Sequence, residues 1–271
     1  MTMIKLGPAG IPISAKGGTS LDGVMKCVEL GLGAMEVEFV RGVGMKNETA
    51  EELGSAAAEA GVDLSIHAPY FINLCSAEKA KVTASKQRIM ESCERGRHMG
   101  AKIVVFHPGF FGKLTKEQAF EKIKIECAQM AEEIKRNGWK ILLGLETTGK
   151  HSSFGSLEET VAIAKDVKGC VPVVDFAHLY ARSMGNINFS EVFDAVKHFG
   201  HLHSHFSGIN YTAAGERNHL PISVKKPDFN EVAKAVMAKS MDITIICESP
   251  LLEQDSLIMK QTFEKLGYSR W

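Results

Sequence analysis

The 271-residue sequence lacks the features that mark several classes of protein. Its 32 Lys and Arg balance its 32 Asp and Glu and its pI is near 7.1, which counts against a strong non-specific DNA binder. No stretch approaches the roughly 18 apolar residues of a transmembrane helix, and the N-terminal MTMIKLGPAGIPIS has no basic region followed by a long apolar core. We therefore expect a cytoplasmic protein without a membrane partner.

Disulfide frameworks, cofactor motifs and linkers are missing as well. The six cysteines are scattered and form no C-x-x-C pair, which is typical of reduced thiols. The first β-rich run leads into GPAGIPIS (7–14), which is not a G-x-G-x-x-G fingerprint, and no P-loop is present. No low-complexity segment divides the chain. We expect one domain over residues 1–271, a monomer, with no organic cofactor.

What the sequence does contain is a regular alternation of β-rich and helical segments. Thr49, Thr115 and Ser156 each precede a helical pattern and are expected as N-caps. Alternating strands and helices imply parallel strands, and eight such units in this length predict an α/β fold, a (β/α)8 TIM barrel. A doubly wound open sheet is the main alternative. The eight apolar runs are 4–7, 34–40, 63–69, 102–109, 141–148, 171–178, 201–208 and 242–250.

Polar side chains recur at the C-terminal ends of these strands, where a barrel carries its active site. Each one alone has an ordinary structural explanation, but closure of the barrel would bring all of them to one place. Histidine and carboxylate together suit zinc, manganese or iron better than magnesium or calcium. The residues in question are His67, His107, Glu146, Asp175, His178, His203, His205 and Glu248.

The run HLHSHFSG (201–208) places three histidines on one face of its strand. We assign His203 to the metal because of its place near the end of the strand. His201 lies deeper and is expected to be structural. His205 lies at the mouth. We expect it to be a further metal ligand, a residue that contacts a metal ligand, or a residue that contacts the substrate.

Six stretches together resemble endonuclease IV, the zinc-dependent abasic-site nuclease, in their order and spacing. They are HAPYFINL (67–74), FHPG (106–109), LETTGKHSSFGSLEE (145–159), VVDFAHLYARS (173–183), LHSHFSG (202–208) and ICESP (246–250). The resemblance implies a barrel that acts on abasic double-stranded DNA with two or three zinc ions, or manganese. It implies one ion on His67, His107 and Glu146, and a second on Glu146, Asp175, His203 and Glu248.

The resemblance also implies a third ion on His178, completed by an Asp-x-His pair after the seventh strand. Here GERNHLPI (215–222) has Glu216 in place of the aspartate and Asn218 in place of the histidine, with His219 one position later. Glu216 remains a ligand, and His219 is a possible one, so the chain resembles a divergent member. The implied catalytic residues are Glu146 and Glu248. The expected DNA contacts are Tyr70, Asn73, Arg41 and Arg182.

Two other functions fit parts of the pattern. Sugar isomerases and epimerases of related barrels use one metal held by Glu, Asp, His and Glu on the last four strands, which Glu146, Asp175, His203 and Glu248 reproduce. That function leaves His67, His107 and His178 without a metal role. A metal-binding barrel that binds damaged DNA without catalysis is the third alternative.

Overall fold

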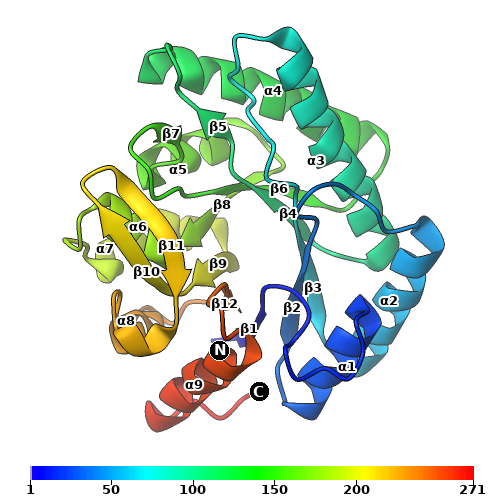
Figure 1. Ribbon diagram of the computed structural model, residues 1–271, viewed down its shortest axis with the longest axis vertical. Helices are drawn as coiled ribbons and strands as arrows, with labels where there is room; N and C mark the ends of the chain where they lie inside the picture. Colours follow the sequence, from blue (N-terminus) through cyan, green and yellow to red (C-terminus); the bar gives the residue numbers. More distant parts are fainter. Residues whose placement is uncertain (1) are drawn as a thin grey trace.

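The computed structural model describes residues 2–271, and its centre is a barrel of eight parallel strands (Figure 1). Neighbours pair in the order β1-β12-β9-β8-β6-β4-β3-β2. The ring closes between β1 and β2, where Ala9 and Glu36 form a parallel bridge. The (β/α)8 prediction is confirmed. The barrel strands are β1 (Ile4–Pro8), β2 (Ala34–Glu38), β3 (Asp63–His67), β4 (Ile103–Phe106), β6 (Leu142–Glu146), β8 (Cys170–Asp175), β9 (Leu202–Phe206) and β12 (Ile243–Cys247).

Closure depends on a glycine in β1. A Cβ atom on Gly7 would lie 1.7 Å from the carbonyl oxygen of Ala34 in β2, so only glycine allows the two backbones to approach this closely. Gly33 in turn donates its backbone N–H to the carbonyl of Leu6 at 3.1 Å.

Helices surround the barrel and bury its outer face. Strand residues that point outward form the main apolar core with these helices; for example, Phe206 of β9 packs on Phe229 of α8, with ring centroids 4.8 Å apart. Among residues 2–271, no helix has the length and apolar character needed to cross a bilayer. The helices are α1 (Ser20–Glu29), α2 (Asn47–Ala60), α3 (Lys79–Met99), α4 (Lys116–Arg136), α5 (Leu157–Asp166), α6 (Phe176–Arg182), α7 (Phe189–Val196), α8 (Phe229–Lys239) and α9 (Glu253–Lys265), with 3-10 turns η1 (Lys197–Phe199) and η2 (Ile222–Val224).

The predicted helix starts are confirmed at two of three positions. Thr115 and Ser156 each form a capping box with the residue three positions on. Thr49 is not an N-cap, because α2 begins at Asn47 and Lys46 precedes it. No side chain caps α2, but Glu48 in its first turn interacts favourably with the positive end of the helix dipole.

Two short antiparallel pairs rise beyond the C-terminal ends of the barrel strands. β5 (Gly109–Phe110) pairs with β7 (Ser153–Phe154), and β10 (Gly208–Thr212) pairs with β11 (Gly215–Leu220). The β10–β11 hairpin follows β9 and packs on α6. It therefore brings additional side chains to the mouth of the barrel.

Candidate metal centre

A cavity of about 280 Å³ opens at the mouth, where the strand ends converge. His67 ends β3, His107 follows β4 directly, and both Nε2 atoms face Glu146 Oε2, at 3.1 and 2.8 Å. His67 also pairs through Nδ1 with the carbonyl of Ala68 at 2.8 Å, which places its proton on Nδ1 and leaves Nε2 free as a ligand. The three side chains form a group that can hold a metal ion.

Glu146 also belongs to a second group, with Asp175, His205 and Glu248. Its other oxygen, Oε1, lies 3.2 Å from Nδ1 of His205. Nδ1 of His205 lies 3.3 Å from Oε1 of Glu248, which follows β12. One carboxylate therefore faces both groups, as expected of a bridging ligand.

The structure places His205, and not His203, in this second group. β9 continues to Phe206, so the inward-pointing residue nearest the mouth is His205. His203 lies one layer deeper and pairs through Nε2 with Glu36 at 2.9 Å. His201 is deeper still, paired with Thr244 Oγ1 at 2.9 Å, and lines a cavity of about 330 Å³ on the opposite side of the barrel.

A third group forms where the β10–β11 hairpin meets α6. His178 donates from Nδ1 to the carbonyl of Thr147 at 2.9 Å, so its Nε2 is free. That Nε2 lies 3.2 Å from Nε2 of His219 and 3.2 Å from Oε2 of Glu216. The ligand atoms that lie close enough to share an ion belong to Asp175, His178 and His219, and Glu216 adjoins them. Asp175 also caps α6 by accepting the backbone N–H of His178.

A β-bulge explains why His219, and not Asn218, faces this group. In the hairpin Asn218 pairs with Asn210 and Glu216 pairs with Tyr211, which leaves Arg217 as an extra residue. A bulge shifts the alternation of side chains by one, so Glu216 and His219 lie on one face although they are three residues apart. Asn218 is exposed.

A glycine on the neighbouring loop allows Glu216 to take this position. The backbone N–H of Gly149 donates to Glu216 Oε2 at 2.8 Å, and a Cβ atom on Gly149 would lie 2.3 Å from the same oxygen. Any larger residue at 149 would displace the carboxylate from the third group.

The charges of these groups suit bound cations. When the ligating histidines are neutral, the carboxylates around the mouth carry a large negative charge. Burial raises the pKa of Glu248 well above its usual range and that of Glu38 to about 7. Burial would lower the pKa of His67, but its hydrogen bond to Glu146 and the charge of Glu38 raise it to about 10. The raised pKa values of Glu248, Glu38 and His67 favour their protonated forms, as expected of a cavity rich in buried carboxylates.

The four residues expected to contact DNA have different surroundings. Tyr70 is 59% exposed on the rim of the mouth, 6.0 Å from the ring of His67, and Arg41 is exposed on the loop after β2. Asn73 instead receives the backbone N–H of Phe110 on its Oδ1 at 3.3 Å. Arg182 donates from one nitrogen to the carbonyls of Thr148, Lys150 and Ser153. Asn73 and Arg182 thus hold loops in place.

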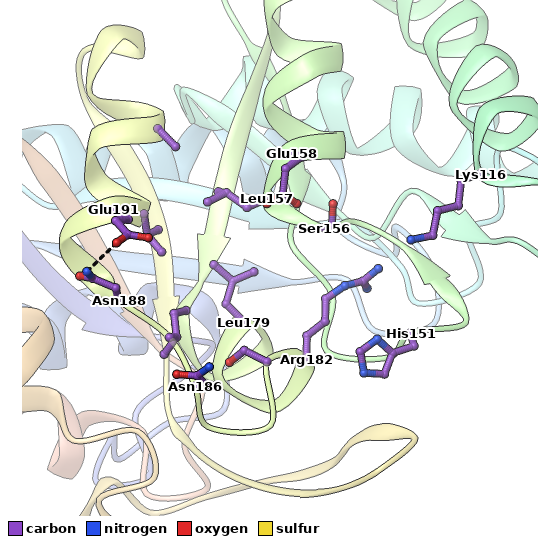
Figure 2. Close-up of a pocket in the computed structure, with 14 residues that line it drawn as sticks. Lys116, His151, Ser156, Leu157, Glu158, Leu179, Arg182, Asn186, Asn188 and Glu191 are labelled. Carbon is purple, nitrogen blue, oxygen red and sulfur yellow. Dashed lines mark hydrogen bonds between the residues drawn. The ribbon is translucent and has the colours of Figure 1, made fainter.

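A larger cavity of about 610 Å³ lies beside the mouth, between α6, α7 and the start of α5 (Figure 2). Arg182 separates His151 from the apolar part of this cavity around Leu157 and Leu179. None of the groups of possible metal ligands in residues 2–271 includes a residue that lines it. The possible metal ligands therefore gather at the smaller cavity.

Two glutamates of β2 were missed by the sequence reasoning. Glu36 is fully buried and Glu38 lines the mouth cavity. The alternation in AMEVEFV could have identified them, because it places two carboxylates at the inward positions of an otherwise apolar strand.

The profile of the xylose isomerase-like TIM barrel family matches residues 24–266. An uncharacterised protein of Methanocaldococcus jannaschii is 36% identical over 97% of this chain and 98% of its own length. A probable endonuclease 4 of Mesomycoplasma hyopneumoniae strain 7448 is 33% identical over 48% of this chain. That match spans 46% of the relative, so the chain aligns with about half of it.

Two solved structures show the same fold. A D-tagatose 3-epimerase-like protein superposes with a TM-score of 0.74 and 20% identity, over 96% of each chain. Endonuclease IV of Thermus thermophilus superposes with a TM-score of 0.71 and 18% identity, over 96% of this chain and 98% of that chain. At these identities the likeness concerns the fold.

Proposed function

Because the chain belongs to the xylose isomerase-like TIM barrel family, we propose that it is a metal-dependent phosphodiesterase that incises abasic DNA, with zinc or manganese at the mouth. The observation that supports this proposal is the presence of three adjoining donor groups in one cavity. A single-metal enzyme needs only the group of Glu146, Asp175, His205 and Glu248. The flanking groups, on His67 with His107 and on His178 with His219, exceed that need.

Each group has a place in phosphodiester hydrolysis. Metal ions held by these residues would supply a nucleophile at neutral pH and stabilise the charge on the phosphate and the leaving oxygen. Glu146 fixes the spacing of two groups because its two oxygens face different histidines. Glu248 lies between His205 and His219, where it can orient the attacking water and hold its proton.

The rim offers two side chains for the DNA. Tyr70 is exposed beside His67 and can pack on the sugar at the abasic position, and Arg41 is free to reach a phosphate. An abasic nucleotide leaves the duplex without the loss of a base pair, so it can enter this cavity at low energetic cost.

The second candidate is a sugar isomerase or epimerase. It is favoured by the completeness of the central group, which alone supplies four ligands, with Glu146 and Glu248 available as acid and base. The two proposals differ in what they require of the flanking histidines.

The test uses a duplex with one tetrahydrofuran abasic analogue, an otherwise identical intact duplex, and a panel of ketoses. Metal-loaded protein should cut only the abasic strand and leave a 3′-hydroxyl. Elemental analysis of protein purified without added metal should find about two or three ions per chain. His107→Ala should lower incision by about 100-fold or more, the order of loss seen when one transition-state contact is removed. One ion per chain, and ketose epimerisation that survives His107→Ala, would establish the second candidate.

A further inference from the structure

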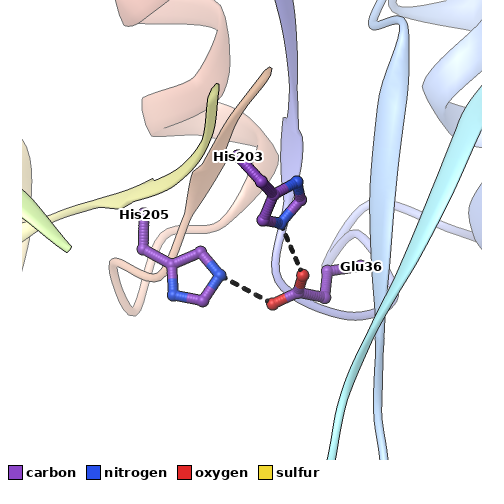
Figure 3. A group of neighbouring side chains, drawn as sticks. All are labelled: Glu36, His203 and His205. Atoms are coloured by element: carbon purple, nitrogen blue, oxygen red, sulfur yellow. Dashed lines mark hydrogen bonds and ion pairs between the residues drawn. The ribbon is translucent and has the colours of Figure 1, made fainter. Parts of the chain in front are cut away.

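Beneath the mouth, Glu36 lies between two histidines of β9 (Figure 3). Its Oε2 accepts hydrogen bonds from Ser65 Oγ at 2.7 Å and His203 Nε2 at 2.9 Å. Its Oε1 lies 2.9 Å from Nε2 of His205. Glu36 and His205 are fully buried, so solvent does not compete for the contact between them.

The two ring nitrogens of His205 face different partners. Nδ1 faces the central donor group, 3.2 Å from Glu146 Oε1 and 3.3 Å from Glu248 Oε1. Nε2 faces Glu36. A neutral imidazole carries one proton, and an ionised carboxylate can only accept it. Carboxylates face both nitrogens, so a cation in the central group selects the tautomer: it would take the lone pair of Nδ1, and Glu36, 2.9 Å from Nε2, would hold the proton there.

We propose that Glu36 is a positioning residue for the metal centre: it sets the tautomer and ring orientation of His205, so that Nδ1 is the ligand. Ser65 and His203 hold the carboxylate in place from the other side. The inference rests on the metal centre of the proposed function and is independent of the substrate. A carboxylate behind a ligating histidine raises the basicity of the ligand and fixes its direction.

A rival arrangement has to be distinguished by experiment. Atoms of Glu36, His203 and His205 also lie within 4.8 Å of one another, close enough to share an inner ion. In that arrangement His203 would be a ligand, whereas in ours it only supports the carboxylate. The two arrangements therefore give opposite predictions for a substitution of His203: loss of an ion in the rival arrangement, and little change in ours.

The test measures metal affinity by competition with a chelator and the visible spectrum of the cobalt-substituted protein. Glu36→Gln should weaken one ion by about 10- to 100-fold and change the cobalt spectrum. Glu36→Asp, which keeps a carboxylate, should lose less. His203→Gln keeps a donor toward Glu36 and should stay within a few-fold of the unmodified protein. Unchanged affinity and spectrum in Glu36→Gln, or loss of a whole ion in His203→Gln, would overturn the proposal.

Two further measurements separate the role from a loss of folding. Glu253→Gln is the matched control, since Glu253 is a buried carboxylate that accepts the backbone N–H groups of Ile13 and Ser14. It should lower stability and leave the cobalt spectrum as it was. In the unmodified zinc-loaded protein, nitrogen NMR of labelled histidine should show His205 protonated at Nε2 and ligated at Nδ1. The reverse assignment would overturn the proposal without any variant. Neither readout involves DNA, so a failed nuclease assay leaves both intact.

Discussion

The Nε2 atoms of His178 and His219 face each other at 3.2 Å, with the two ring planes at 86°. Because His178 already donates from Nδ1 to a carbonyl, its Nε2 presents a lone pair to His219. His219 is held from behind by Ser207, whose Oγ lies 2.9 Å from Nδ1. Two imidazole nitrogens at this distance require a proton or a cation near both, and Glu216 supplies the adjoining negative charge.

The first prediction concerns the ligand role of His219. His219→Ala should weaken the ion at the third group by about 10-fold or more, as expected for loss of a metal ligand or its close partner. Asn218→His, by contrast, should have little effect, because residue 218 lies on the exposed face of the hairpin. Incision and metal affinity are to be followed across a range of free zinc. Tighter binding in Asn218→His would show that the bulge does not persist in solution.

The second prediction concerns the bulge itself. Deleting Arg217 leaves Glu216 and His219 two positions apart in a regular strand, and so again on one face. The deletion should therefore keep the third ion within a few-fold of the original affinity. Arg217→Ala is the control, since it keeps the bulge and should leave the affinity for the third ion unchanged. Loss of the ion in the deletion alone would mean that regular pairing turns one of the two ligands away.

The third prediction concerns pH and the metal-free protein. The pKa of His67 rises from 6.5 to about 10 on folding, so its stabilising effect is complete below pH 6.5 and is lost as the pH rises through 10. The pKa of Glu38 rises from 4.5 to about 7, so folding favours its protonated form and loses this contribution as the pH rises through 7. The free energy of unfolding in chelator should therefore fall with increasing pH.

Urea denaturation between about pH 5.5 and 9.5, with chelator and with zinc, measures this effect. Zinc should reverse the trend, because metal binding displaces protons and strengthens as the pH rises. A metal-free protein that gains stability toward high pH would contradict the assignment of surplus negative charge to the mouth. Substitution of Glu38 by Gln should remove the part of the slope that lies between pH 4.5 and 7.

The fourth prediction separates two arginines. Arg182 donates to three carbonyls of the loop that carries Gly149, and Gly149 in turn binds Glu216. Arg182→Ala should destabilise the fold by about 1 kcal/mol, since three carbonyls, two of them partly buried, lose their donor, and should also weaken the third ion. Arg41→Ala should leave stability unchanged and reduce affinity for DNA. Equal losses of DNA affinity and unchanged stability in both variants would restore Arg182 as a phosphate contact.

The strand ends could be predicted from sequence because barrel topology makes them converge. Five of the predicted ligands end or follow an apolar run, and the structure brings all five to one mouth. They are His67, His107, Glu146, Asp175 and Glu248. The choice between His203 and His205 depended on where β9 ends, and a run of alternating histidines does not mark that point. A shift by one inward position changes which layer of the barrel a side chain joins.

Other features depend on pairing between segments that sequence alone does not align. The bulge at Arg217 is a property of the register of β10 against β11. The contact of Glu36 with His205 joins residues far apart in the sequence, on β2 and β9, which become close only when the barrel closes. Thr49 was expected to cap α2, but the helix begins at Asn47, since local propensity permits either start.

The candidate ligands are spread along the chain from His67 at the end of β3 to Glu248 after β12, and no short segment within residues 2–271 holds a complete group. An unfolded or partly translated chain would therefore offer no site, and ions would bind only the closed barrel. Free metal then acts on the lifetime of the protein: at a concentration about 100 times the dissociation constant, one ion adds about 2.7 kcal/mol to stability. In a metal-starved cell the same chain would open more often, and proteases that cut the open form would remove it first.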